Sequence, residues 1–122
     1  MFKKKKNKFE NLNYLELTPI ANYNYEKNEK GLINVLVPRF TDKIFGKILQ
    51  PRLKSKYIKA NLDEIGTATW LLINGSKNVH QIANDLSKQF GEKIHPVNER
   101  LTQFLTQLYQ AGFISFAEIK KG

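Results

Sequence analysis

Three helix-length apolar patterns within residues 62–116 constrain the fold of this chain more than any other feature. They run over residues 63–74, 79–90 and 96–111, and in the last two the apolar residues recur at the spacing of one helix face. A short helix is marginal alone and must bury its apolar stripe against a neighbour. The sequence therefore predicts three short helices that pack on one another, followed by a β segment over residues 113–116.

Start and stop signals surround these patterns. Asn78 precedes the second pattern as an N-cap, and Gln81 lies three residues further on, as in a capping box. Gly91 is expected to end that helix in the left-handed conformation, and Gly112 stops the third helix. The carboxylates at 63–64 are explained by capping and by the macrodipole at the start of the first helix.

The segment before the helices predicts three strands. Thr18-Pro19 is expected to turn the chain, after which residues 21–26 alternate in polarity as a strand. The turn residues at 28–31 and the β-branched run at 32–37 predict an antiparallel hairpin. Residues 57–62 are expected to form the third strand, which leads directly into the first helix.

The predicted architecture is a winged-helix-like α+β domain, with a small three-stranded antiparallel sheet packed beside a three-helix bundle. We expect one domain over residues 11–117, preceded by a disordered basic arm over 1–10 and followed by a tail over 118–122. A lysine-rich insert is expected over residues 40–56. A sheet this small cannot close on itself, so at least one strand edge should stay unpaired.

The sequence offers no catalytic residues. The only imidazoles are His80 and His95, and there is no cysteine to act as a nucleophile or a metal ligand. No glycine-rich phosphate-binding motif occurs. We therefore expect no enzymatic activity, cofactor or metal. The lack of cysteine, of a secretion signal and of a long apolar run predicts a cytoplasmic protein with no membrane association.

The order and spacing of several residues resemble the PqqD-like family, named for the D protein of pyrroloquinoline quinone biosynthesis. These residues are Leu62-Asp63-Glu64-Ile65-Gly66, Trp70, Asn74-Gly75, Val79, Ile82-Ala83, Phe104-Leu105, Leu108 and Gly112-Phe113-Ile114. The resemblance covers about the last half of the chain. It implies a non-catalytic peptide chaperone, or recognition element, that captures the leader of a ribosomally made precursor peptide. The leader would then be presented to a modifying enzyme, commonly a radical-SAM protein.

The resemblance also implies where the leader binds. It would add as an extended strand to the edge of the third strand, with side chains entering a groove beside the third helix. The strand side of this groove is Tyr57, Ile58, Lys59 and Ala60, and the helix side is Arg100, Gln103, Phe104 and Gln107. Lys59 and Arg100 would favour a leader with acidic residues. Phe104 has an alternative interpretation as a core residue.

DNA binding is the alternative function, because three helices followed by a β segment also describe a winged helix-turn-helix. The sequence pI of about 9.8 suggests a polyanionic partner. The charge distribution argues against nucleic acid: residues 1–59 contain 14 Lys or Arg and 5 Asp or Glu, whereas residues 60–122 contain 6 of each. In the third helix Arg100 is offset by Glu99. We expect a monomer or a homodimer, since an open edge can also pair with a second copy.

Overall fold

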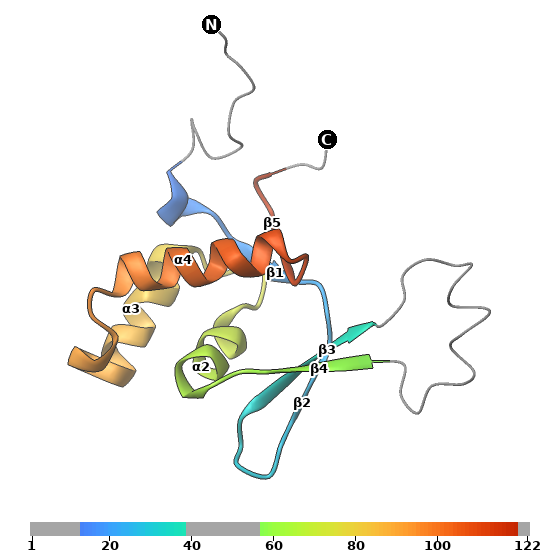
Figure 1. Cartoon of the computed structure of the whole chain (residues 1–122). Coiled ribbons are helices and arrows are strands. Elements are labelled where there is room, and N and C mark those ends of the chain that lie inside the picture. The colour runs from blue at the N-terminus through green and yellow to red at the C-terminus, as the bar shows by residue number, and fades with distance from the viewer. Residues whose placement is uncertain (1–12, 39–56, 120–122) are drawn as a thin grey trace, which may run out of the picture. The chain divides into compact units, whose positions relative to one another are not determined.

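The computed structural model describes residues 13–38 and 57–119 (Figure 1). These residues belong to two compact units. We call residues 23–38 and 57–67 the sheet unit, and residues 13–22 and 68–119 the helical unit. The basic arm and the insert predicted from the sequence lie outside the described residues.

Three short strands form the sheet unit. β2 spans Tyr25–Lys27, β3 spans Ile33–Pro38 and β4 spans Tyr57–Asn61. The strands lie in the order β2-β3-β4, and both pairs are antiparallel (Figure 1). Val35 in the central strand is opposite Tyr25 on one side and Ala60 on the other. The predicted hairpin and third strand are therefore confirmed, with β3 in the middle.

The turn between β2 and β3 is held by one asparagine and one glycine. Asn28 Oδ1 accepts hydrogen bonds from the backbone N–H groups of Lys30 at 2.9 Å and Leu32 at 3.1 Å. Gly31 has a φ of +81°, a conformation that residues with a Cβ rarely adopt. The turn predicted from these residue types is thus formed by the expected chemistry.

Helix α2 (Glu64–Leu72) begins in the sheet unit and continues into the helical unit. Asp63 Oδ1 accepts the backbone N–H of Gly66 at 2.7 Å, which confirms its predicted role as a cap. The first turn is also tied to β3, because Thr67 Oγ1 accepts the N–H of Ile33 at 2.9 Å. Since Ile33 is fully buried, this bond satisfies a backbone donor that water does not reach.

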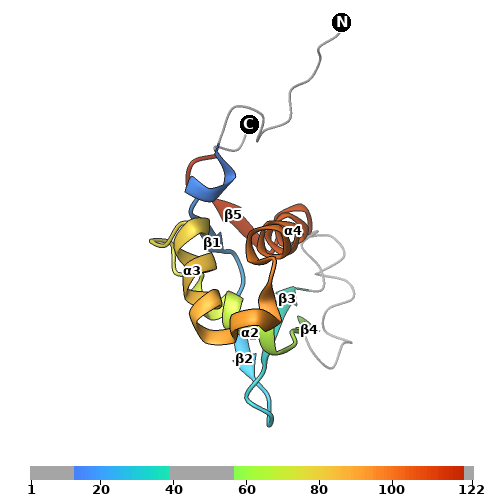
Figure 2. The same ribbon diagram turned by 90° about the vertical axis from the view of Figure 1, so that its left-hand side faces the viewer.

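The helical unit contains two further helices and a two-stranded sheet. Its elements after α2 are α3 (Val79–Phe90), the 3₁₀ helix η3 (Gly91–Ile94), α4 (Val97–Gln110) and β5 (Ile114–Phe116). The chain enters this unit through the 3₁₀ helix η1 (Tyr14–Glu16) and β1 (Pro19–Ala21). β1 pairs with β5 in antiparallel fashion, so the two ends of the described chain meet here (Figure 2).

The predicted apolar stripes of α3 and α4 form the core of the helical unit. The buried residues are Val79, Ile82, Ala83 and Leu86 on α3, Leu101, Leu105 and Leu108 on α4, and Ile114 and Phe116 on β5. α3 contacts α4, η1 and η3, and α4 contacts β5. Each helix therefore buries one face against its neighbours, as short helices require.

The ends of α3 and α4 follow the sequence signals with one difference. Asn78 and Gln81 form the capping box before α3. At the end of α4, the N–H of Gly112 donates to Tyr109 O at 3.1 Å and that of Phe113 to Leu108 O at 2.9 Å, which is a Schellman motif. Gly91 has a positive φ of 60°, but its ψ of −131° lies outside the left-handed helical region. The predicted left-handed end of α3 is wrong, because the chain turns directly into η3.

The turn predicted at Thr18-Pro19 is wrong. Pro19 begins β1, and the continuous strand predicted over residues 21–26 is split between β1 and β2. The backbone of Asn22 donates to Phe113 and that of Ala117 to Thr18, so alternation directs the backbone of Pro19 away from β5. Its missing N–H removes no bond from the pair, and proline is tolerated at such a strand edge.

The fold is α+β, with a three-stranded antiparallel sheet and three helices among the described residues. This confirms the class predicted from the sequence. The comparison with a winged helix stays a prediction.

Candidate functional site

The outer edge of β4 presents backbone hydrogen-bonding groups. β4 is the last strand in the sheet, and no other strand in the described ranges pairs with its second edge. The N–H of Leu62 donates to Ile33 O, so even-numbered residues of this segment direct their backbone toward β3. Alternation turns the N–H and C=O of Lys59 and Asn61 outward. These groups can pair with another extended chain.

The side chains of β4 differ on its two faces. Ile58 and Ala60 share a face with the buried Val35, yet Ile58 remains 49% exposed. Tyr57, Lys59 and Asn61 share the opposite face, called here the outer face, with Glu26 and Asn34. A strand that paired with this edge would meet apolar side chains on one face and polar ones on the outer face.

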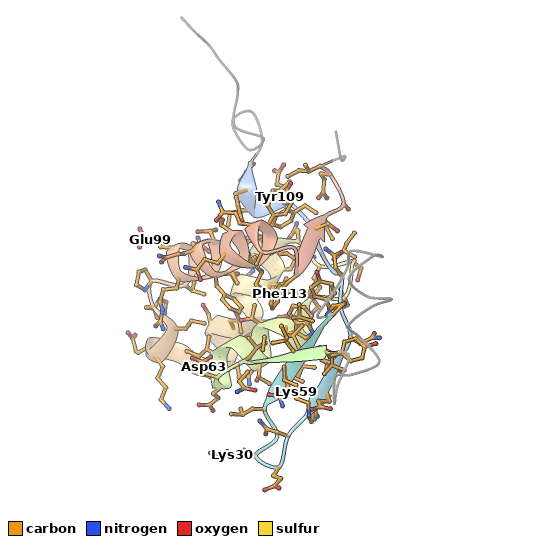
Figure 3. All side chains as sticks on the ribbon, turned by 45° about the vertical axis from the view of Figure 1, so that its right-hand side comes forward. Lys30, Lys59, Asp63, Glu99, Tyr109 and Phe113 are labelled. Carbon is orange, nitrogen blue, oxygen red and sulfur yellow. The ribbon has the colours of Figure 1, made fainter. Side chains whose placement is uncertain are left out.

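Lys59 is engaged in an ion pair across the outer face. Its ammonium Nζ lies 2.8 Å from Glu26 Oε2, and the two side chains are 54% and 40% exposed. The labelled Lys59 lies on β4, and the labelled Lys30 marks the turn between β2 and β3 (Figure 3). The hydrogen bond from Lys59, helped by one from Asn34, lowers the pKa of the Glu26 carboxyl group. The carboxylate is therefore the stable form of Glu26 near neutral pH.

Asn34 lies in the cross-strand row between Glu26 and Asn61, on the central strand. Asn34 is only 8% exposed to solvent. The side-chain Nδ2 donates to Glu26 Oε2 at a long 3.5 Å, and Oδ1 is buried with no hydrogen-bond partner in the part of the chain that the structure describes. A buried acceptor without a partner is uncommon and costly.

The helix residues predicted for the groove share one face of α4. Arg100, Gln103 and Gln107 are exposed, and Phe104 is half-buried between them and the buried leucines of the same helix. Arg100 Nη1 donates to the backbone carbonyl of Lys93 at 2.7 Å, which holds its guanidinium near η3. The remaining N–H groups of this side chain give it further donors for an anionic partner.

The eight residues predicted from the sequence thus fall into two sets in different units. Tyr57, Ile58, Lys59 and Ala60 belong to the sheet unit, and Arg100, Gln103, Phe104 and Gln107 to the helical unit. Within each set the residues lie on one strand or one helix face. The groove that would join the two sets stays a prediction.

Sequence reasoning missed Glu26 and Asn34. Glu26 ends the strand that the sequence predicts over residues 21–26. It lies 33 positions from Lys59, and nothing local links the two residues. The available signal was the strand alternation. Once β2 and β4 are assigned to the two edges of one sheet, an acidic and a basic residue on the same face become candidates for a cross-strand pair.

The two histidines belong to the helical unit and not to β4. His80 is exposed on α3, where its Nε2 is 3.5 Å from Asn84 Nδ2, and His95 is exposed after η3. Across residues 13–38 and 57–119, no group of three His, Asp or Glu side chains is arranged to hold a metal ion. None of the helices described has the length and apolar character needed to span a membrane.

These features define a class: a small α+β protein whose sheet ends, within the described residues, in an edge strand with mixed polar and apolar side chains. The family model for Coenzyme PQQ synthesis protein D (PqqD) matches residues 48–114. Because the match covers more than half of the chain, the protein belongs to the PqqD family. The match includes β4, α2, α3 and α4, while β1, β2 and β3 precede it.

No curated protein gives a significant match to this chain. No solved structure gives one either. Membership of the PqqD family fits a general role in recognising ribosomally made precursor peptides for cofactor or peptide natural-product biosynthesis.

Proposed function

We propose that this protein captures the leader of a ribosomally made precursor peptide and presents it to a modifying enzyme of the radical-SAM type. The observation that carries the proposal is the edge of β4, where the backbone of Lys59 and Asn61 is directed outward. An extended leader would pair with this edge through main-chain hydrogen bonds, which are largely independent of side-chain identity. The protein itself performs no chemistry and supplies a template.

Side chains on β4 and α4 would then determine which leader sequences bind. Lys59 and Arg100 would attract acidic residues, and the exposed Ile58 would contact an apolar one. The amides of Gln103 and Gln107 would donate or accept hydrogen bonds as the leader requires. Phe104 is half-buried and would contribute its exposed edge.

A second copy of the chain is a less suitable occupant of this edge. If two copies paired through β4 to form one continuous sheet, the two-fold axis would place one residue of β4 opposite the same residue of the second copy. In the register that places Lys59 opposite Lys59, two like-charged residues are cross-strand partners, which is destabilising. Lysine at an edge strand is also a common device against self-association.

DNA is not favoured by the described residues. They contain 7 Lys or Arg and 9 Asp or Glu, so this part of the chain carries no excess of positive charge. A recognition helix needs cations that anchor phosphates. On α4, Arg100 stands beside Glu99 and already donates to a backbone carbonyl.

Proline scanning of a bound peptide tests the strand-addition proposal. Peptides selected for binding to the full chain are substituted with proline at successive positions, and their affinities are measured by fluorescence anisotropy. Each lost main-chain hydrogen bond should weaken binding by roughly fivefold, equivalent to about 1 kcal/mol, at every second position. Insensitivity at all positions would rule out pairing with the edge of β4.

Removing the charge of Lys59 on β4 and reversing that of Arg100 on α4 test the proposed side-chain contacts. Lys59→Gln and Arg100→Glu should each weaken binding of an acidic peptide by roughly three- to tenfold while the circular dichroism spectrum stays unchanged. Lys88→Glu, an exposed charge reversal on α3, provides the matched control. Equal affinities for all variants would remove both cations from the site.

A further inference from the structure

We propose that Glu26 is an internal competitor for the guest peptide, because it holds Lys59 across the outer face of the sheet until a guest carboxylate displaces it. The inference rests on the proposed function and extends it to the class of peptide. The favoured guest is an extended segment with an acidic residue opposite Lys59 and apolar residues on either side of it.

The position of the ion pair within the sheet carries the inference. Glu26 lies on β2 and Lys59 on β4, with β3 between them. Neighbouring strands lie about 4.8 Å apart, so the two backbones are separated by about 10 Å. To come within 2.8 Å of Glu26, the ammonium of Lys59 must extend over β3 and away from the free edge. A guest paired with that edge would lie on the opposite side of β4.

The ion pair can exchange for an intermolecular one. Both side chains are about half exposed to solvent, and exposed ion pairs contribute little stability of their own. A guest carboxylate held beside β4 by main-chain hydrogen bonds is at a high local concentration and competes effectively with Glu26.

Asn34 assists this exchange. It lies next to Glu26 in the cross-strand row, and its buried Oδ1 lacks a hydrogen-bond partner within the described ranges. If the Lys59 side chain, which extends over β3, covers the outer face at Asn34, its withdrawal toward the edge lets water reach that oxygen. Because a buried, unsatisfied acceptor is unfavourable, its hydration offsets part of the loss of the ion pair.

The strand geometry fixes the expected peptide pattern. Residues directly opposite one another in a β ladder place their side chains on the same face, so the guest residue opposite Lys59 points to the outer face. Its two neighbours point to the face of Ile58 and Ala60, where apolar side chains are favoured. The guest pattern is therefore apolar, acidic, apolar.

A displayed library of random peptides, selected on the immobilised full-length protein, tests both the pattern and the competition. Recovered peptides are compared with versions in which the central Asp or Glu is replaced by its amide. We expect Glu26→Gln to raise the affinity for acidic peptides about two- to fivefold, the range that corresponds to an exposed ion pair, and to leave the amide versions unchanged.

Two control variants separate competition from a general electrostatic effect. Glu29→Gln removes the same charge from the turn between β2 and β3 and should not alter affinity. In a Lys59→Gln background, Glu26→Gln should have no effect, because no ammonium remains to be released. A gain that persists without Lys59 would show that Glu26 acts through its field alone and would overturn the inference.

The outcomes also separate this inference from the proposed function. If no peptide is enriched, the proposed function fails. If peptides are enriched and depend on the edge of β4, but show no acidic preference or no response to Glu26→Gln, only the competition model fails. Enrichment of the apolar, acidic, apolar pattern with the expected response of each variant supports both.

Discussion

Glu118 links the two ends of the described chain through a charge-assisted contact. Its carboxylate accepts the backbone N–H of Thr18 at 2.7 Å and the hydroxyl of the same residue at 2.8 Å. Desolvation by burial raises the pKa of the Glu118 carboxyl group. The hydrogen bonds to Thr18 lower it and outweigh desolvation, so the pKa lies below its ordinary value near 4.5. A carboxyl group whose pKa is lower in the folded state stabilises the protein above the unfolded pKa, and this contribution is lost as pH falls through the folded pKa.

We therefore predict that Glu118→Gln lowers the free energy of unfolding by about 0.5–1 kcal/mol at pH 7, a magnitude reduced by solvent exposure. The difference from the unmodified chain should begin to shrink as the pH falls below about 4.5, the unfolded pKa, and should vanish below the lower folded pKa, where both side chains are neutral. Urea unfolding at several pH values measures this. Glu29→Gln serves as a control in an exposed turn, and a pH-independent difference would contradict the assignment.

At the scale of single residues, the sequence predicts which residues could form the site better than it predicts the contacts that those residues make. The sequence predicts Lys59 and Arg100 as cations that would attract an acidic peptide, and the structure shows both residues exposed. It also shows Lys59 paired with Glu26 and Arg100 bonded to the carbonyl of Lys93. These partners depend on strand order and on the path of η3, which local patterns do not specify.

At the scale of elements, the capping box of α3 predicts that asparagine-to-alanine substitutions at two positions of this helix change the free energy of unfolding differently. Asn78 Oδ1 accepts the N–H of Gln81 at 2.8 Å, and Gln81 Oε1 accepts the N–H of Asn78 at 2.9 Å. Asn78→Ala should therefore lower the free energy of unfolding by about 1 kcal/mol.

The matched control is Asn84→Ala, on the exposed side of the same helix. There the substitution replaces a weak helix former by the strongest one, so stability should stay constant or rise by a few tenths of a kcal/mol. Thermal unfolding of both variants provides the comparison. Equal losses at the two positions would show that the capping box contributes nothing specific.

The elements also show where sequence reasoning stops. The start of α3 and the end of α4 were predictable, because caps and glycines act on residues a few positions away. The pairing of β1 with β5 was not, since Pro19 and its partner Phe116 are nearly a whole chain apart. A local pattern at Thr18-Pro19 fits a turn and an edge strand equally well, and only the distant partner decides between them.

For the whole molecule, the main electrostatic feature is the separation of charge along the chain. The described residues carry 7 Lys or Arg and 9 Asp or Glu, whereas the remaining segments carry 13 Lys or Arg and 2 Asp or Glu. Five of those lysines lie within residues 1–8. A polyanion would therefore be attracted mainly by residues outside the sheet and helical units, whereas the proposed peptide site lies within them.

This separation predicts that deletion of residues 1–8 affects the two kinds of binding differently. Elution from heparin should shift to lower salt, and the salt dependence of polyanion binding should become shallower, by at most about 4.5 in the logarithmic slope for five lost lysines. Affinity for a selected peptide should stay the same within error, because strand pairing with β4 uses backbone groups. Isothermal titration of the full and shortened chains measures the second quantity. If instead heparin retention survived the deletion while peptide affinity fell, the basic segment would belong to the peptide site and a cationic surface elsewhere would bind the polyanion.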